Sequence, residues 1–230
     1  MTANPVSVNS NASLISPEIG KSSQALSSKR IAPAHPPLKL GILASGSGSN
    51  FGVIAQAIQN QQLNAQIPVL IYNNPEAKAA ARAEKYGIPS ILLNHRDCKS
   101  REELDTKIVK NFQEYDVEWV VMAGWMRIVT QVLLDAFPDR VINIHPSLLP
   151  SFPGTRAVEQ ALAAKVKITG CTVHIARLEV DSGPILMQAA VPVLPEDTAE
   201  TLHARIQVQE HKIMLGAIAL IAESNRKYCD

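Results

Sequence analysis

Cysteine, aromatic residues and long apolar runs are scarce in this sequence. The 230 residues include 3 Cys, and Phe, Trp and Tyr together make up 4%. Cys98, Cys171 and Cys229 are odd in number, lie far apart and form no CxxC pair. This pattern disfavours a disulfide framework and a zinc site and suits a reducing compartment, so we expect a cytoplasmic protein without a metal. No apolar run approaches the roughly 20 residues that a membrane-spanning helix needs.

An excess of charge of either sign is also absent. The 22 Lys and Arg residues nearly balance the 21 Asp and Glu residues, which leaves a formal net charge of +1 at pH 7. Nucleic-acid-binding domains usually carry a strongly basic surface, so we expect neither a nucleic-acid partner nor a membrane partner. The hydrophobic share of 46% is enough to bury a core, and the length suits one large domain or two small ones.

The first 37 residues differ in composition from the rest. They are rich in Ser, Asn, Ala and Pro, and they have neither an apolar signal-peptide run nor a helical stripe. We therefore interpret 1–37 as a disordered extension and 38–230 as the catalytic domain. An organelle transit peptide is the alternative, because the stretch is Ser-rich and has a single acidic residue, Glu18. Its few basic residues count against targeting.

Strand-like and helix-like segments alternate from Leu38 onward. Short apolar runs predict buried strands, and segments with apolar residues three and four apart predict helices. The predicted strands are 38–45, 67–74, 88–93, 117–124 and 140–145, and the predicted helices are 51–60, 75–87, 100–115 and 130–136. The helix 75–87 is expected to begin at Pro75, and Ser100 with Glu103 forms a capping box for the helix 100–115. This alternation predicts an α/β fold: a mostly parallel twisted sheet with helices on both faces.

The regular alternation of strands and helices stops in the C-terminal part. A helix is expected at 156–165, and two β-rich runs follow within 168–198 around a turn at Asp181, Ser182 and Gly183. A long helix at 200–224 ends the pattern. We therefore expect a Rossmann-like N-terminal half and a mixed-sheet C-terminal half.

A glycine-rich loop, ASGSGSNF, joins the first predicted strand to the first predicted helix. Gly46 and Gly48 allow the backbone to approach an anion closely, and Ser47, Ser49 and Asn50 add short polar groups at the helix N-terminus. We expect the loop to bind a phosphate, and the alternative is that it is a purely structural turn. The loop is not a dinucleotide fingerprint, because the third glycine is displaced and no acidic residue ends the second strand.

Two polar residues end the strand 140–145. Asn143 and His145 are two positions apart, so both side chains lie on one face near the carboxyl end of the strand. The segment INIHPSLLPSFPG continues with three prolines, which stiffen the loop. Asp181, in a turn between strands, is the candidate carboxylate, because an Asp beside a His favours the imidazolium. The set suits acyl transfer with a nucleophile that the substrate provides, since the amide of Asn143 can stabilise an oxyanion.

Five segments resemble the phosphoribosylglycinamide formyltransferases, the folate-dependent enzymes of purine biosynthesis. They are GILASGSGSNF, VVMAGWMRIV, INIHPSLLPSFPG, GCTVHIARLEVDSGPIL and RIQVQEHKIML, in the same order and at similar spacing. The resemblance implies the formyltransferase fold, small-molecule substrates and a monomer or homodimer. It also implies formyl transfer from 10-formyltetrahydrofolate, as co-substrate, to glycinamide ribonucleotide.

The resemblance also implies roles for individual residues. Asn143, His145 and Asp181 would be catalytic. The ribonucleotide would contact Gly48, Ser49, Asn50 and Glu210. The folate would contact Arg101, Met126, Arg127, Ile128, Val129, Arg177, Leu178, Glu179 and Val180.

Plainer interpretations accompany these assignments. Arg101 would also suit a solvated helix surface, Glu210 a solvent-facing helix position, and the segment 122–129 a buried core. His174 suits either support of the catalytic residues or plain packing.

Three other functions share parts of the pattern. Methionyl-tRNA formyltransferases carry a further C-terminal domain, and formyltetrahydrofolate hydrolases carry a regulatory domain before the core; neither is expected here. A nucleotide-binding regulator would not require the Asn–His–Asp set.

Overall fold

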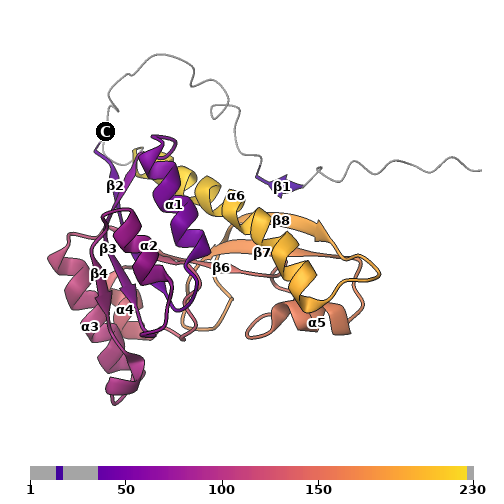
Figure 1. Ribbon diagram of the computed structural model, residues 1–230, viewed down its shortest axis with the longest axis horizontal. Helices are drawn as coiled ribbons and strands as arrows, with labels where there is room; N and C mark the ends of the chain where they lie inside the picture. Colours follow the sequence, from indigo (N-terminus) through magenta and orange to yellow (C-terminus); the bar gives the residue numbers. More distant parts are fainter. Residues whose placement is uncertain (1–13, 18–35, 227–230) are drawn as a thin grey trace, which may run out of the picture.

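The computed structural model describes residues 14–17 and 36–226, with side chains described to residue 224. Within this part the chain forms a sheet of eight strands in the order β1-β8-β7-β6-β5-β2-β3-β4 (Figure 1). The strands are β1 Ile15–Ser16, β2 Leu38–Ala44, β3 Ala65–Tyr72, β4 Ser90–Leu92, β5 Trp119–Met122, β6 Val141–His145, β7 Ile168–Ile175 and β8 Ile185–Pro192.

The sheet is parallel on one side and antiparallel on the other. Strands β4, β3, β2, β5 and β6 pair in parallel, whereas β7, β8 and β1 add antiparallel pairs beyond β6. The chain therefore leaves β2 toward β3 on one side and later returns to β5 on the other. Such a switch point opens a crevice at the carboxyl ends of the strands.

Helices cover both faces of the sheet (Figure 1). They are α1 Ser49–Gln59, α2 Ala79–Lys85, α3 Arg101–Glu114, α4 Gln131–Ala136, α5 Ala157–Ala163 and α6 Ala199–Arg226. One apolar core joins the sheet to α1, α2 and α6, and a second joins the opposite face to α3 and α4. Along β5, Trp119 and Val121 enter the first core, and Val120 and Met122 enter the second. Because β5 is buried on both faces, every one of its residues is apolar, which explains the continuous apolar run in the sequence.

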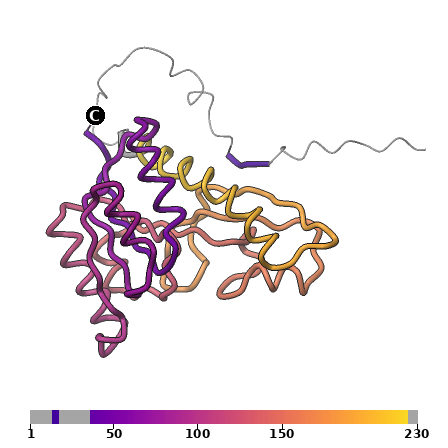
Figure 2. Tube along the Cα trace, in the orientation of Figure 1, coloured from indigo at the N-terminus to yellow at the C-terminus, as the bar shows by residue number. Residues whose placement is uncertain are grey.

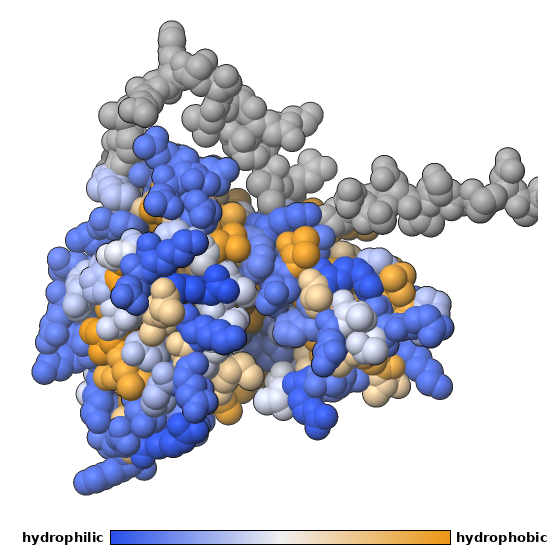
Figure 3. Space-filling view, in the orientation of Figure 1, coloured by the Kyte–Doolittle hydropathy of each residue, from blue (hydrophilic) through white to orange (hydrophobic). Residues whose placement is uncertain are grey.

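The long helix α6 connects the two halves of the sheet. The chain trace in Figure 2 follows it from the side of β7 and β8 to the neighbourhood of α1. It packs against β7, β8 and α1, so its buried face contributes to the same core as the parallel strands. In the view of Figure 3, hydrophilic residues dominate the surface and hydrophobic residues form small groups among them. Within the part described, no helix is both long enough and apolar enough to cross a membrane.

The predicted fold class is confirmed, whereas α1, β3, β4 and β5 begin two residues away from their predicted starts and α2 begins four residues away. Helix α2 begins at Ala79 and not at Pro75, because Asn74 forms a turn first: its side chain accepts from the Glu76 N–H at 3.3 Å and its carbonyl from the Ala77 N–H at 2.9 Å. Strand β3 begins at Ala65, two residues before the predicted 67.

Helix α3 has the predicted N-cap, with a modified capping box. Ser100 Oγ accepts from the Glu103 N–H at 3.2 Å. The Glu103 carboxylate accepts from the Lys99 N–H at 2.8 Å, one residue before the cap.

Part of the predicted extension is ordered. Ile15 and Ser16 pair with Ala189 and Gln188 at the edge of β8, which differs from the expected disorder at these positions. A two-residue strand carries no periodicity, so its pattern could not be recognised in the sequence. The rest of the extension, apart from 36–37, lies outside the described residues, and so does Cys229, which was expected to be a free thiol.

The close approach of β7 and β8 gives a stability prediction. A Cβ at Gly170 would overlap the Ala189 carbonyl oxygen and come within 2.9 Å of Leu148 Cδ2. We expect Gly170→Ala to lower the free energy of unfolding by about 1–3 kcal/mol, the usual cost of overpacking. Thermal unfolding followed by circular dichroism measures it. Gly46→Ala is the control, because nothing lies within 4 Å of its added Cβ; equal midpoints for the two variants would contradict the prediction.

Candidate active site

A cavity of about 650 Å³ opens at the carboxyl ends of β2, β5 and β6. It lies at the switch point of the sheet, where ligand sites of open α/β folds are found. Segments far apart in the sequence line it: the glycine loop 45–50, residues 122–129 after β5, residues 143–146 at the end of β6, the turn before β8, and α6. The cavity therefore collects the motifs that the sequence placed on separate elements.

Asn143 and His145 reach this cavity from β6. They lie opposite His174 and Thr172 of the antiparallel strand β7. His145 is buried, and Asn143 is partly exposed to the cavity. Because the two residues share one strand face, their side chains point to the same side, as the sequence predicted.

Asp181 joins them from the turn between β7 and β8. Its Oδ2 lies 3.3 Å from His145 Nδ1 and accepts from the Gly154 N–H at 2.7 Å. Its Oδ1 lies 3.5 Å from His174 Nε2. Burial alone would raise the pKa of Asp181, but the hydrogen bonds from His174 and Gly154 and the charges of both histidines outweigh it, so the pKa is lowered. The carboxylate is therefore held ionised.

Asp181 adopts a left-handed backbone conformation. Its φ is 57°, a region that few non-glycine residues occupy and that Asp tolerates better than most. Gly183, two residues later, allows the turn to close, because a Cβ there would overlap the Ile175 carbonyl oxygen. The turn thus aims the carboxylate inward at some conformational cost.

Both ring nitrogens of His145 face acceptors. Nε2 lies 2.8 Å from the carbonyl oxygen of Phe152, and Nδ1 faces Asp181. A ring with protons on both nitrogens satisfies both contacts. The proline-rich loop that follows His145 in the sequence therefore also fixes the plane of its ring, through the Phe152 carbonyl.

Strands β7 and β8 anchor this loop. Thr172 Oγ1 donates to the Ser147 carbonyl at 2.7 Å and accepts from the Leu149 N–H at 3.1 Å. Gln188 Nε2 donates to the Leu149 carbonyl at 3.0 Å. The loop is therefore held by side chains as well as by its prolines, and the carbonyl that meets His145 is fixed in place.

His174 contacts two of the predicted catalytic residues, Asn143 and Asp181. It is 2% exposed, so it cannot be a surface group. Its Nδ1 lies 3.0 Å from the Ile175 carbonyl, and its Nε2 lies 3.2 Å from Asn143 Nδ2. Nε2 thus faces two groups, the Asn143 amide at 3.2 Å and Asp181 Oδ1 at 3.5 Å, and the position of the ring proton decides which of them it bonds. Of the two interpretations left open by the sequence, contact with the catalytic residues is the one observed, and it orients the Asn143 amide.

The glycine loop leads directly into α1. Gly48 is the N-cap residue with φ 66°, and a Cβ there would lie 2.9 Å from Ala79 Cβ, so both the backbone angle and the packing require glycine. The first N–H groups of an α-helix have no partner within the helix, and they point here toward the cavity end of α1. From α2, Arg82 Nε donates to the Ser47 carbonyl at 2.7 Å and holds the loop from outside.

Helix α6 meets the loop from the opposite side. Glu210 Oε2 accepts from Asn50 Nδ2 at 3.2 Å, and Gln207 Nε2 donates to Ser49 Oγ at 3.0 Å. The Asn50 Oδ1 is buried and has no hydrogen-bond partner, which leaves an acceptor for a ligand. Glu210 is 5% exposed, and burial raises its pKa, although the hydrogen bond from Asn50 opposes the shift. The plainer alternative, a solvent-facing position for Glu210, was therefore wrong.

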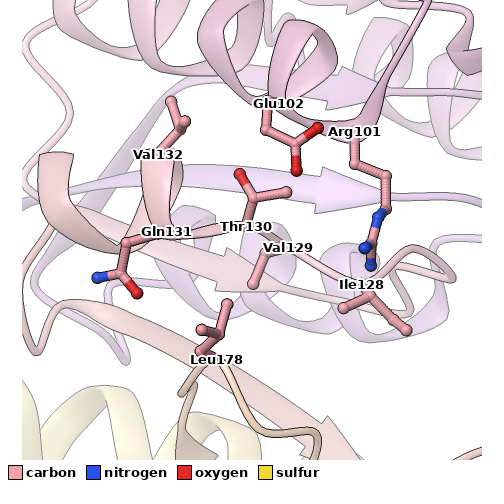
Figure 4. Close-up of a pocket in the computed structure, with 8 residues that line it drawn as sticks. All are labelled: Arg101, Glu102, Ile128, Val129, Thr130, Gln131, Val132 and Leu178. Carbon is pink, nitrogen blue, oxygen red and sulfur yellow. The ribbon is translucent and has the colours of Figure 1, made fainter.

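The residues expected at a folate lie around two neighbouring cavities. Met126, Arg127, Ile128, Val129, Arg177 and Val180 line the large one. Arg101 and Leu178 line a smaller cavity of about 360 Å³, together with Ile128, Val129 and residues of α4 (Figure 4). Glu179 does not occur among the described residues that line either cavity. Met126 is 78% exposed and Ile128 is 51% exposed, so both present apolar surface at the cavity.

Two contributors to the site were missed in the sequence. Gln207 precedes Glu210 by three residues on α6, a spacing that places both on one helix face and could have identified it. Arg82 had no recognisable signal, because its contact with Ser47 joins α2 to the loop across the fold. Among the described residues, no group of three or more His, Cys, Asp or Glu side chains could hold a metal ion.

Comparisons with known sequences agree with this site. A family model described as formyl transferase matches residues 38–218. The phosphoribosylglycinamide formyltransferase of Bacillus subtilis is 39% identical over 174 residues, which cover 76% of this chain and 89% of that protein. The human trifunctional purine biosynthetic protein adenosine-3 is 40% identical over 184 residues. That match covers 80% of this chain and only 18% of the human protein, so the chain corresponds to one part of it.

Solved structures give the same answer. Glycinamide ribonucleotide transformylase 1 from Symbiobacterium toebii superimposes with a TM-score of 0.82 at 40% identity, covering 85% of this chain and 92% of that one. Phosphoribosylglycinamide formyltransferase from Bacillus halodurans gives 0.77 at 40% identity, covering 80% and 94%. The chain therefore belongs to the formyl transferase family and, within it, to the phosphoribosylglycinamide formyltransferases.

Proposed function

We propose that this chain transfers the formyl group of 10-formyltetrahydrofolate to the amine of glycinamide ribonucleotide, in de novo purine biosynthesis. The products are formylglycinamide ribonucleotide and tetrahydrofolate. The observation that carries the proposal is the meeting of Asn143, His145 and Asp181 in one cavity with the glycine loop. The set contains no Ser or Cys and therefore no obvious nucleophile, so the attacking group belongs to a substrate.

The reaction follows from the chemistry of an amine and a formamide. The substrate nitrogen attacks the formyl carbon, and the resulting tetrahedral intermediate carries an oxyanion and an ammonium. Asn143 Nδ2 and the Nε2–H of His145 are the donors for the oxyanion. The Nε2–H that donates to Phe152 in the structure exchanges that carbonyl for the substrate oxygen.

Collapse of the intermediate breaks the bond from carbon to the folate nitrogen. One proton leaves the new amide nitrogen and one reaches the departing folate nitrogen, so the proton count balances. Asp181 orients the His145 ring for this exchange, because its carboxylate lies 3.3 Å from Nδ1.

The ribonucleotide occupies the glycine-loop side of the cavity. Its phosphate lies at the N-terminus of α1 against Gly48, Ser49 and Asn50, where free N–H groups and the helix dipole favour an anion. Glu210, already bonded to Asn50, accepts hydrogen bonds from the sugar hydroxyls.

The folate occupies the other side, against residues 126–129 and 177–181. Its ring system lies on the exposed apolar side chains of that surface, and its acidic tail extends along the smaller cavity, where Arg101 descends toward Ile128 (Figure 4). Arg177 is engaged with Asp139, so Arg101 is the freer cation for a carboxylate.

The setting of the reaction is proposed from the same features. Cys98 and Cys171 are free thiols, which suits the cytoplasm. The partners are the two small substrates, without nucleic acid or membrane, and the protein acts as a monomer or homodimer.

The direct test is an assay of the purified chain with 10-formyltetrahydrofolate and glycinamide ribonucleotide, with mass spectrometry of the product. Formylated ribonucleotide is expected. Formylation of charged initiator tRNA without turnover of the ribonucleotide would reject the proposal.

Substitution of the catalytic residues tests their roles. We expect His145→Ala and Asp181→Asn each to lower kcat by roughly 10²–10⁴-fold, the usual contribution of a general acid–base group. Asp116→Asn is the control, because Asp116 is an exposed carboxylate paired with Lys39 at the far end of the sheet. Near-normal rates in folded His145→Ala protein would remove His145 from the mechanism.

Glu210 gives a prediction with opposite effects on stability and binding. Its raised pKa means that the folded state keeps the proton to higher pH than the unfolded state, so stability falls as the pH rises through the folded pKa. Glu210→Gln should therefore unfold at a higher temperature than wild type at pH 8, with the difference shrinking toward pH 4. Its KM for the ribonucleotide should rise. A lower midpoint at pH 8 would show that the buried charge stabilises the fold.

Arg101 tests the path of the folate tail. We expect Arg101→Ala to raise KM for the folate by up to about 5-fold, the effect of one exposed ion pair, and to leave KM for the ribonucleotide unchanged. Lys110→Ala removes an exposed charge from the same helix and is the control. An unchanged folate KM would mean that Arg101 is only a solvated surface charge.

A further inference from the structure

Three polar side chains of α6 lie in one row along the cavity. His203, Gln207 and Glu210 are spaced by four and three residues, which places them on one face of the helix. All three line the large cavity. Glu210 and Gln207 have roles in holding the glycine loop, but His203 has none so far.

The row runs in register with the glycine loop. Glu210 contacts Asn50 at 3.2 Å, and Gln207, one turn earlier on α6, contacts Ser49 at 3.0 Å. Residues nearer the N-terminus of α6 therefore face residues nearer the start of the glycine loop. His203 is one further turn along on the same helix face, and it lines the same cavity.

The three side chains of the row become more exposed toward the N-terminus of α6. Glu210 is buried, Gln207 is partly buried and His203 is exposed. The ring of His203 is therefore accessible to a ligand that enters the mouth of the cavity, whereas the carboxylate of Glu210 is accessible only from inside. This gradient suits a molecule whose sugar lies deep and whose phosphate lies near the mouth.

Four arginines lie at or near the cavity, and one of them, Arg127, lines it from the segment that follows β5. Arg177 is paired with Asp139, and Arg156 of the α5 N-terminus lies 3.8 Å from Glu159. Arg82 donates to the Ser47 carbonyl from behind the loop. A phosphomonoester carries a charge of about −1.5 to −2 at pH 7, so backbone N–H groups alone leave much of it unbalanced.

We propose that His203 binds the phosphate of the ribonucleotide, opposite the N-terminus of α1. This inference rests on the proposed function and assigns a further specificity-determining residue to that site. An imidazole N–H donates to a phosphate oxygen, and the protonated ring adds a positive charge. His203 thereby makes the enzyme select the phosphorylated substrate over its riboside. The charge of His203 also opposes the rise in the pKa of Glu210, in agreement with its place in the row.

The experiment compares two ligands that differ only in the phosphate. Binding of glycinamide ribonucleotide and of the corresponding glycinamide riboside is measured by calorimetry for wild type, His203→Ala, His203→Gln and Lys212→Ala. We expect His203→Ala to weaken ribonucleotide binding about 10-fold, the effect of one charge-assisted hydrogen bond, and to leave riboside binding unchanged. His203→Gln, which keeps a donor, should recover part of the loss.

Lys212→Ala is the matched control. Lys212 is an exposed cation on α6 that is absent from the residues lining the cavity, so its removal should alter neither affinity. Equal losses for both ligands in His203→Ala would overturn the proposal, since they would place the effect on Glu210 or on the helix. An unchanged ribonucleotide affinity would overturn it as well. Because binding is measured without turnover, a wild type that binds with this selectivity but forms no product would reject only the proposed reaction.

Discussion

The carboxylate of Asp181 contacts two buried imidazoles at once, and the geometry of both depends on it. It lies 3.3 Å from His145 Nδ1 and 3.5 Å from His174 Nε2. His174 in turn orients the amide of Asn143, so one carboxylate connects both groups proposed to stabilise the oxyanion. A charge with so little solvent around it is stable only because these rings and the Gly154 N–H surround it.

The change from parallel to antiparallel pairing makes this arrangement possible. Strand β6 ends the parallel series and pairs with β7 in the opposite direction, so Asn143 lies opposite His174. The turn after β7 then returns Asp181 to the carboxyl end of β6. The parallel half brings the glycine loop to the same edge, because β2 and β5 are neighbours at the switch point. The antiparallel half thus supplies His174 and Asp181, which contact the proposed catalytic residues, and the parallel half supplies the proposed anion site.

Local patterns in the sequence predicted much of the fold. The two-residue period placed Asn143 and His145 on one face, and continuous apolar runs identified strands buried on both sides. Contacts between distant segments had no comparable signal: the pairing of Asn143 with His174 depends on strand register, and the burial of Glu210 depends on where α6 meets α1. The start at Pro75 was misjudged because Asn74 forms a turn that competes with the helix, and β1 is too short for any period.

The central claim is that the two substrates meet between Asn143 and His145. A crystal structure of the chain with glycinamide ribonucleotide and an unreactive folate analogue tests it directly. The account predicts the phosphate at residues 48–50, the folate ring against 126–129, and the substrate amine beside the Asn143 amide and the His145 ring. A phosphate bound away from the glycine loop, or a folate ring outside the cavity that holds Asp181, would contradict it.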